Sequence, residues 1–170
     1  MRYTTSLLRL LAILSFSHLG LAADQTRQAD FTGTWQLDSK RSEGVPSGME
    51  QTLIVKQSAD RVDVEVKVSG PQGDRTSTDA YILNGKEADF TPAILGGGTP
   101  KSGKRTSTWA ADGTGFEATE KAVLDGPEGD DEITGKRTWR LSPDGKELTI
   151  VMDLQGGGGP LKSKRIFTRK

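Results

Sequence analysis

The chain has 170 residues, a length that suits one domain, and it contains no cysteine. Its single histidine is His18, so the rest of the chain has neither imidazole nor thiol groups. This excludes Ser-His-Asp and Cys-His catalysis, zinc sites built from histidine or cysteine, and the usual haem ligands. The 23 basic and 23 acidic residues balance, so net charge gives no overall attraction to nucleic acid or to an anionic membrane.

The first 22 residues have the layout of a secretory signal peptide. Arg2 precedes an apolar run that begins at Leu7, and Gly20-Leu21-Ala22 supplies small residues for cleavage. The run is shorter than the roughly 20 apolar residues of a transmembrane helix. A cysteine-free exported chain must be held together by core packing, which favours a bacterial periplasmic or secreted protein. We therefore expect an exported protein whose mature chain, residues 23–170, forms one domain without a membrane span.

From residue 31 onwards, apolar and polar residues alternate. In "RVDVEVKVS" the residues Val62, Val64, Val66 and Val68 share one face, and polar residues occupy the other. Such alternation is typical of strands with one buried and one exposed face. We expect ten strands, near residues 31–38, 50–57, 60–69, 74–84, 86–91, 102–110, 114–124, 131–141, 146–155 and 161–169.

Turn signals separate these strands. Asn84-Gly85, Asp112-Gly113 and Asp144-Gly145 predict tight antiparallel hairpins, because these residues accept the positive φ that such turns require. No stretch shows a helical period, and residues 39–49 are expected to form a loop. Sequential strands joined by tight turns make a meander, and closing the meander into a barrel removes its exposed edges. The predicted fold is all-β, a single antiparallel up-and-down β-barrel of about ten strands.

The segment "GTPKSGKR", residues 98–105, resembles a phosphate-binding P-loop. Arg105 stands where a P-loop has the Ser or Thr that contacts Mg²⁺, and the β-prone "RTSTWAADG" follows instead of a helix. Without a helix N-terminus, backbone N–H groups do not converge on a phosphate. We therefore interpret the segment as a Gly-rich connection that enters a strand.

Charged clusters indicate no metal site, cofactor or catalytic centre. The acidic run "DGPEGDDE", residues 125–132, lacks the spacing of a calcium-binding EF-hand loop and is expected to be a solvated loop. No two carboxylates are placed together for acid–base catalysis, so we expect a protein that is not an enzyme. Basic residues do not interleave with aromatic residues on a shared face, so we expect no nucleic acid partner.

Basic residues also gather at two strand entrances, 101–105 and 162–165. If these two strands pair, the lysines and arginines form a basic rim that attracts an anionic ligand. The other interpretation is a charged surface that acidic residues elsewhere balance.

The segment "FTGTWQLDSKRSEG", residues 31–44, resembles the first strand of the calycin superfamily, the lipocalins and fatty-acid-binding proteins. The shared signature is Gly-x-Trp, here Gly33-Thr34-Trp35. The chain is also similar to small exported bacterial lipocalin-like proteins, through "GTW-x-L", the turn from Ser142 to Lys146 and a basic-aromatic last strand. The resemblance extends in layout over residues 30–170 and implies a β-barrel.

The resemblance also implies how the barrel closes. Trp35 is expected inside it, near the closed end, beneath an arginine of the last strand, either Arg165 or Arg169. A guanidinium over an indole ring is a cation–π contact. Gly33 belongs to the same closure.

In fatty-acid-binding proteins an Arg-x-Tyr pair on the last strand binds a carboxylate. Here the matching residues are Arg165-Ile166-Phe167, and the phenylalanine lacks the hydroxyl donor. Arg165 and Arg137 are the candidate contacts for an anion.

The function that the resemblance implies is binding of a small, largely apolar ligand within the barrel, since barrel mouths commonly hold such ligands. Candidate lining residues are Tyr81, Phe90, Trp109, Phe116, Trp139 and Met152. The alternative is a non-enzymatic cell-envelope interaction module, with a packed barrel whose Gly-rich basic loops contact a partner. A lumen of several hundred Å³ favours the first function, and a packed interior favours the second. A monomer is expected in either case.

Overall fold

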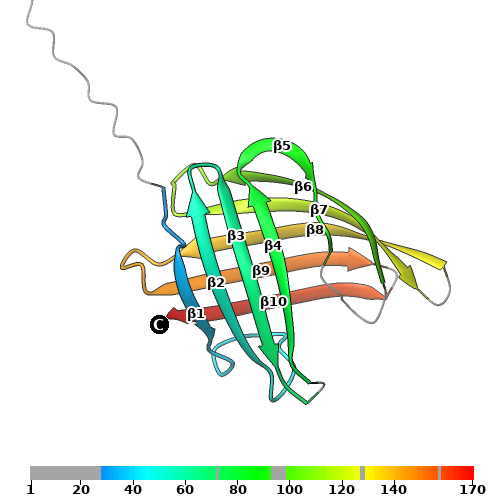
Figure 1. Ribbon diagram of the computed structural model, residues 1–170, viewed down its shortest axis with the longest axis horizontal. Coiled ribbons are helices and arrows are strands. Elements are labelled where there is room, and N and C mark those ends of the chain that lie inside the picture. The colour runs from blue at the N-terminus through cyan, green and yellow to red at the C-terminus, as the bar shows by residue number, and fades with distance from the viewer. Residues whose placement is uncertain (1–27, 72, 93–98, 127–128, 157) are drawn as a thin grey trace, which may run out of the picture.

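The computed structural model describes residues 28–71, 73–92, 99–126, 129–156 and 158–170 (Figure 1). The expected signal peptide, residues 1–22, lies outside the described residues. Within the described residues, no helix is long and apolar enough to cross a membrane. The strands are β1 (Gly33–Leu37), β2 (Glu50–Ser58), β3 (Arg61–Ser69), β4 (Arg75–Ile82), β5 (Asn84–Asp89), β6 (Thr99–Trp109), β7 (Gly115–Gly126), β8 (Gly129–Leu141), β9 (Glu147–Gly156) and β10 (Gly159–Arg169).

All ten strands belong to one antiparallel sheet. Its order is β4-β3-β2-β1-β10-β9-β8-β7-β6-β5, so the first and last strands pair in the middle, with Trp35 opposite Arg169. The sheet curves until its two ends approach each other (Figure 1), and β4 contacts both β5 and β6. This confirms the predicted all-β, up-and-down barrel. Each predicted range matches one strand, except that 74–84 also includes Asn84, the first residue of β5.

The barrel is not closed by backbone hydrogen bonds at every strand. β4 and β5 follow one another in the chain but lie at opposite ends of the sheet order. The prediction of a tight hairpin at Asn84-Gly85 is therefore wrong. Both residues begin β5, and Gly85, with φ of +72°, accommodates an irregularity in the pairing of β5 with β6. The boundary between β4 and β6 is called the seam below.

Inward-facing apolar residues form two separate clusters. The closed-end core contains Phe31, Trp35, Leu37, Leu53, Val55, Val62, Val64, Tyr81, Leu83, Phe116, Ala118, Trp139, Leu148, Ile150 and Phe167. The mouth cluster contains Ala122, Leu124, Ile133 and Leu154, with Phe90 and Met152 packed against it. At this end Leu161, which is in phase with the inward-facing Ser163, is 40% exposed, so the barrel is open to solvent there.

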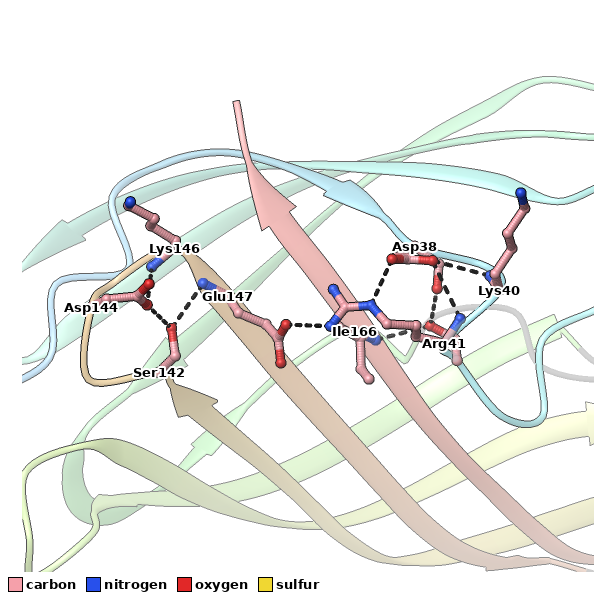
Figure 2. Close-up of polar contacts among 9 residues, drawn as sticks. Asp38, Lys40, Arg41, Ser142, Asp144, Lys146, Glu147 and Ile166 are labelled. Carbon is pink, nitrogen blue, oxygen red and sulfur yellow. Dashed lines mark hydrogen bonds and ion pairs between the residues drawn. The ribbon is translucent and has the colours of Figure 1, made fainter.

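Residues 39–49 form a loop, as predicted, and the loop continues the barrel wall beside β10. Figure 2 shows how it is fastened: Arg41 binds the carboxylates of Asp38 and Glu147 at 2.7 and 2.6 Å. The amide of Ile166 donates to the Ser42 hydroxyl, and the backbone of Glu43 forms an isolated antiparallel β-bridge with that of Lys164. The chain entering β2 is thereby fixed against β10.

Candidate functional site

A layer of charged and polar side chains separates the two apolar clusters. Its members occupy inward-facing positions on six different strands, where strand alternation would ordinarily place apolar residues. They are Gln51 on β2, Asp79 on β4, Arg105 on β6, Glu120 on β7, Arg137 on β8, and Arg165 with Ser163 on β10. Charges in such a position require partners, because burial without them is costly.

Arg105 is fully satisfied by the protein itself. Its Nη1 donates to Asp79 Oδ1 at 2.6 Å and to the Ala80 carbonyl at 2.8 Å, and its Nη2 lies 3.1 Å from Asp79 Oδ2. Its Nε and Nη2 each lie 3.0 Å from Glu120 Oε1. A guanidinium has five N–H donors, and these contacts engage all three of its nitrogens. Arg105 is therefore a structural ion-pair centre.

The same residue joins the two sides of the seam. Asp79 and Ala80 belong to β4 and Arg105 to β6, so its hydrogen bonds connect strands that share no backbone ladder. The guanidinium lies between two rings, 4.1 Å from the centre of Tyr81 and 3.9 Å from that of Phe90. Gly103 leaves room for Phe90, because a Cβ there would lie 2.5 Å from the ring.

Arg137 and Arg165 differ from Arg105 because donors on both remain unpaired. Arg137 Nη2 donates to Glu120 Oε2 at 3.2 Å, and Arg165 Nη1 donates to Gln51 Oε1 at 2.9 Å. The Nε of each arginine is buried without a hydrogen-bond partner among the described residues, as is the Ser163 hydroxyl. Since buried donors are almost always satisfied, this arrangement suits an acceptor from outside the chain.

The layer carries a surplus of positive charge. Three arginines face two carboxylates, those of Asp79 and Glu120, both already engaged. Among the described residues no carboxylate forms an ion pair with Arg165. Burial, together with the positive charge of Arg137, lowers the pKa of Arg165 below its ordinary value. An anion placed beside Arg165 would remove this imbalance.

Arg137, Arg165 and Ser163, whose buried donors are unpaired, line a cavity of about 60 Å³ inside the barrel. Its polar wall consists of Gln51, Asp79, Arg137, Ser163 and Arg165, and the rest is provided by Tyr81 and by apolar residues of β2, β3, β8, β9 and β10. A smaller space of about 20 Å³ lies beside it, between Phe90 and the mouth cluster. The larger space holds a few water-sized groups or a small polar head group, but not a whole large ligand.

The structure divides the six residues expected to line a ligand. Tyr81, Trp139 and Met152 line the 60 Å³ cavity, and Phe90 lines the smaller space. Phe116 and Trp109 line neither of these two spaces. Both pack with Phe31 in or against the closed-end core, where ring-to-ring contacts fill the interior.

The two last-strand arginines have different positions. Arg169 lies over the Trp35 ring, whereas Arg165, the other arginine expected at this closure, faces the cavity. Arg137 and Arg165, the candidate anion contacts, lie on β8 and β10, separated in the sheet by β9, and both line the same cavity.

The two basic strand entrances do not come together to form one rim. β6 and β10 do not pair, because three strands lie between them, so the two basic strand entrances do not combine. Lys101, Lys104 and Lys162 each form ion pairs with nearby carboxylates. Within the described part of the acidic segment, Asp125 and Asp130 contact Lys101. No group of three or more potential metal ligands occurs among the residues that the structure describes.

The P-loop-like segment continues into β6, not into a helix, as predicted. Gly98, its first residue, lies outside the described residues. Sequence reasoning nevertheless missed the importance of Arg105, Glu120 and Asp79. A signal was present: Glu120 is in phase with Phe116, Ala118 and Leu124 on β7, so the strand pattern placed a carboxylate on the apolar face.

Comparisons with known proteins give structural similarity at low sequence identity. The zebrafish ileal bile acid-binding protein in complex with cholic acid matches with a TM-score of 0.48 and 19% identity, over 82% of this chain and 98% of that protein. Secretory abundant heat soluble protein 4 from Ramazzottius varieornatus matches with a TM-score of 0.48 and 14% identity, over 85% and 97%. No family model and no curated protein matches the sequence.

Proposed function

We propose that the protein binds a small amphipathic molecule whose anionic group lies between Arg137 and Arg165. The observation that carries this proposal is the cavity at which both arginines have buried, unpaired donors and at which positive charge is in surplus. Planar guanidinium groups suit carboxylate-like anions because two parallel N–H donors match two oxygens. The partly buried setting strengthens such a contact relative to water.

The size of the cavity determines how a ligand would lie. About 60 Å³ accommodates a head group, so the apolar part would extend along Val66 and Met152 towards the mouth cluster. Val66 and Met152 are both partly exposed, so an apolar chain would bury their remaining surface, a gain of about 25 cal/mol per Å². The proposed ligand is therefore small and largely apolar, with one polar end.

We also propose that the protein is exported, with residues 1–22 removed, and that it acts by binding without chemistry. The signal-like layout of residues 1–22 supports export. The saturated Arg105 network supports a rigid binding wall, because it fixes the seam beside the cavity.

Calorimetric titration of residues 23–170 tests the proposal with three probes. Decanesulfonate carries the anion and the apolar chain, decanol lacks the charge, and methanesulfonate lacks the chain. We expect decanesulfonate to bind most tightly, and Arg165→Gln to weaken it by about tenfold or more. Lys164→Gln is the matched control, because Lys164 is the exposed neighbour on the same strand. Equal binding of decanesulfonate by the wild type and by Arg165→Gln would exclude this site.

The second candidate is a cell-envelope interaction module, which the packed closed-end core favours. The interior cavity is smaller than the several hundred Å³ of a pocket that encloses a whole ligand. A larger, open groove of about 630 Å³ crosses the outer face of β5 to β9. For this function, retention of a protein partner from the envelope would survive Arg165→Gln and would be lost when groove residues such as Lys136 are changed.

A further inference from the structure

We infer that Glu120 restricts the site to ligands with a single negative charge, an inference that rests on the proposed function. Glu120 is 5% exposed, and each of its carboxylate oxygens contacts a different arginine. Oε1 accepts from Arg105 at 3.0 Å and Oε2 from Arg137 at 3.2 Å. The carboxylate thus occupies one end of the Arg137 guanidinium before any ligand arrives.

The ion pairs divide the layer into satisfied and unsatisfied charges. Asp79 binds Arg105 through both oxygens, which makes that pair neutral. Glu120 neutralises Arg137, the second positive charge. Arg165 donates to the amide oxygen of Gln51 and forms no ion pair among the described residues, so it keeps the third charge uncompensated. The site therefore lacks one negative charge, not two.

The electrostatic free energy of binding therefore differs between a monoanion and a dianion. A sulfonate or carboxylate at Arg165 brings the layer to neutrality, and it can accept a further hydrogen bond from Arg137. A dianion adds a second negative charge to a cavity that Asp79 lines and whose Arg137 is already paired with Glu120, and like charges in a poorly solvated site repel strongly. The ligand class that fits is an amphipathic monoanion, such as a carboxylate or a sulfate or sulfonate ester, and not an alkyl phosphate dianion.

The test compares decanesulfonate with decyl phosphate, which share the same apolar chain. At about pH 8 the phosphate is mostly a dianion because its second pKa lies near 6. We expect the wild type to prefer the sulfonate by about tenfold or more. In Glu120→Gln, which keeps the shape but removes the charge, the preference should fall by about tenfold, mainly because the phosphate binds more tightly. Glu117→Gln is the control, because Glu117 lies on the outer face of β7 beside Lys136.

A measurement on the wild type alone covers the case in which Glu120→Gln fails to fold. Decyl phosphate should bind more weakly at about pH 8 than at about pH 5.5, where it is mostly a monoanion, while decanesulfonate should bind equally at both values. Tight, equal binding of both probes at pH 8 would overturn the role of Glu120 and leave the proposed function intact. Failure of both probes to bind at either pH would overturn both.

Discussion

The guanidinium carbon of Arg169 lies 4.4 Å from the centre of the Trp35 ring. Trp35 is fully buried, and its Nε1 donates to the Phe31 carbonyl at 2.8 Å. Arg169 donates to three backbone carbonyl groups around it, those of Asp30, Thr32 and Gly145. One side chain of the last strand therefore joins the segment that enters β1 to the turn between β8 and β9. Its position over the ring is also the reason for the glycine of the Gly-x-Trp signature: Gly33 has φ of +142°, and a Cβ there would lie 3.2 Å from Arg169 Nη1.

Trp35→Ala should lower the free energy of unfolding by about 3–5 kcal/mol, because it removes a buried ring and leaves a cavity in the closed-end core. Urea denaturation of residues 23–170 measures the effect. Thr168→Ala, an exposed change beside Arg169, is the control and should leave the midpoint nearly unchanged. A Trp35→Ala midpoint close to that of the wild type would show that this ring does not support the fold.

Removal of residues 161–170 should abolish cooperative unfolding. Most of β10 is lost, and β10 pairs with both β1 and β9, so its loss opens the wall at its middle and exposes two strand edges. Circular dichroism during thermal unfolding reports the loss, and a chain that lacks Lys170 alone serves as the control. A sharp transition in the shortened chain would contradict the closed sheet.

Arg105→Leu and Lys104→Ala form a matched pair of neighbours with opposite expected results. Arg105→Leu leaves two inward carboxylates without their main partner and should cost about 3–5 kcal/mol in urea denaturation. Lys104→Ala removes an exposed ion pair with Asp89 and should leave stability nearly unchanged. Similar stability losses for the two variants would show that Arg105 is not the centre of the layer. A melting shift with Mg-ATP that disappears in Lys104→Ala would instead restore the P-loop interpretation.

Tyr81 should resist ionisation until the protein unfolds. Burial raises the pKa of its hydroxyl well above the ordinary value of 10.0. Because the folded state holds this proton more tightly than the unfolded state, the contribution to stability is complete below about pH 10 and is lost as the pH rises towards the folded pKa. Tyr81 is the only tyrosine in residues 23–170, so the ultraviolet absorbance of phenolate reports it directly.

The expected result is a phenolate signal that appears together with alkaline unfolding, measured by circular dichroism in the same samples. In urea, the same chain should titrate near pH 10. Phenolate formation near pH 10 in protein that is still folded would show that the Tyr81 hydroxyl is accessible to water.

The sequence alone determined the strands and the direction of their side chains. Successive side chains on a strand point to opposite faces, so the spacing of Val62, Val64 and Val66 specified the buried face of β3 without any knowledge of its neighbours. The turns at Asp112-Gly113 and Asp144-Gly145 were also predictable from local sequence, because glycine accepts the positive φ found at both Gly113 and Gly145. Strand number, fold class and the Gly33-x-Trp35 signature were therefore available before the structure.

The tertiary structure alone decided which arginines are structural and which face a cavity. In sequence, Arg105, Arg137 and Arg165 are alike: each is a cation at an inward position of a strand. The partners of Arg105 are 15 and 26 residues away, and Gln51 is 114 residues from Arg165. These residues are far apart in the sequence and meet only when the sheet curves. A buried charge is therefore satisfied by whichever strands the curvature brings opposite it. The curved sheet saturates Arg105 at the seam and leaves Arg165 with a single amide partner.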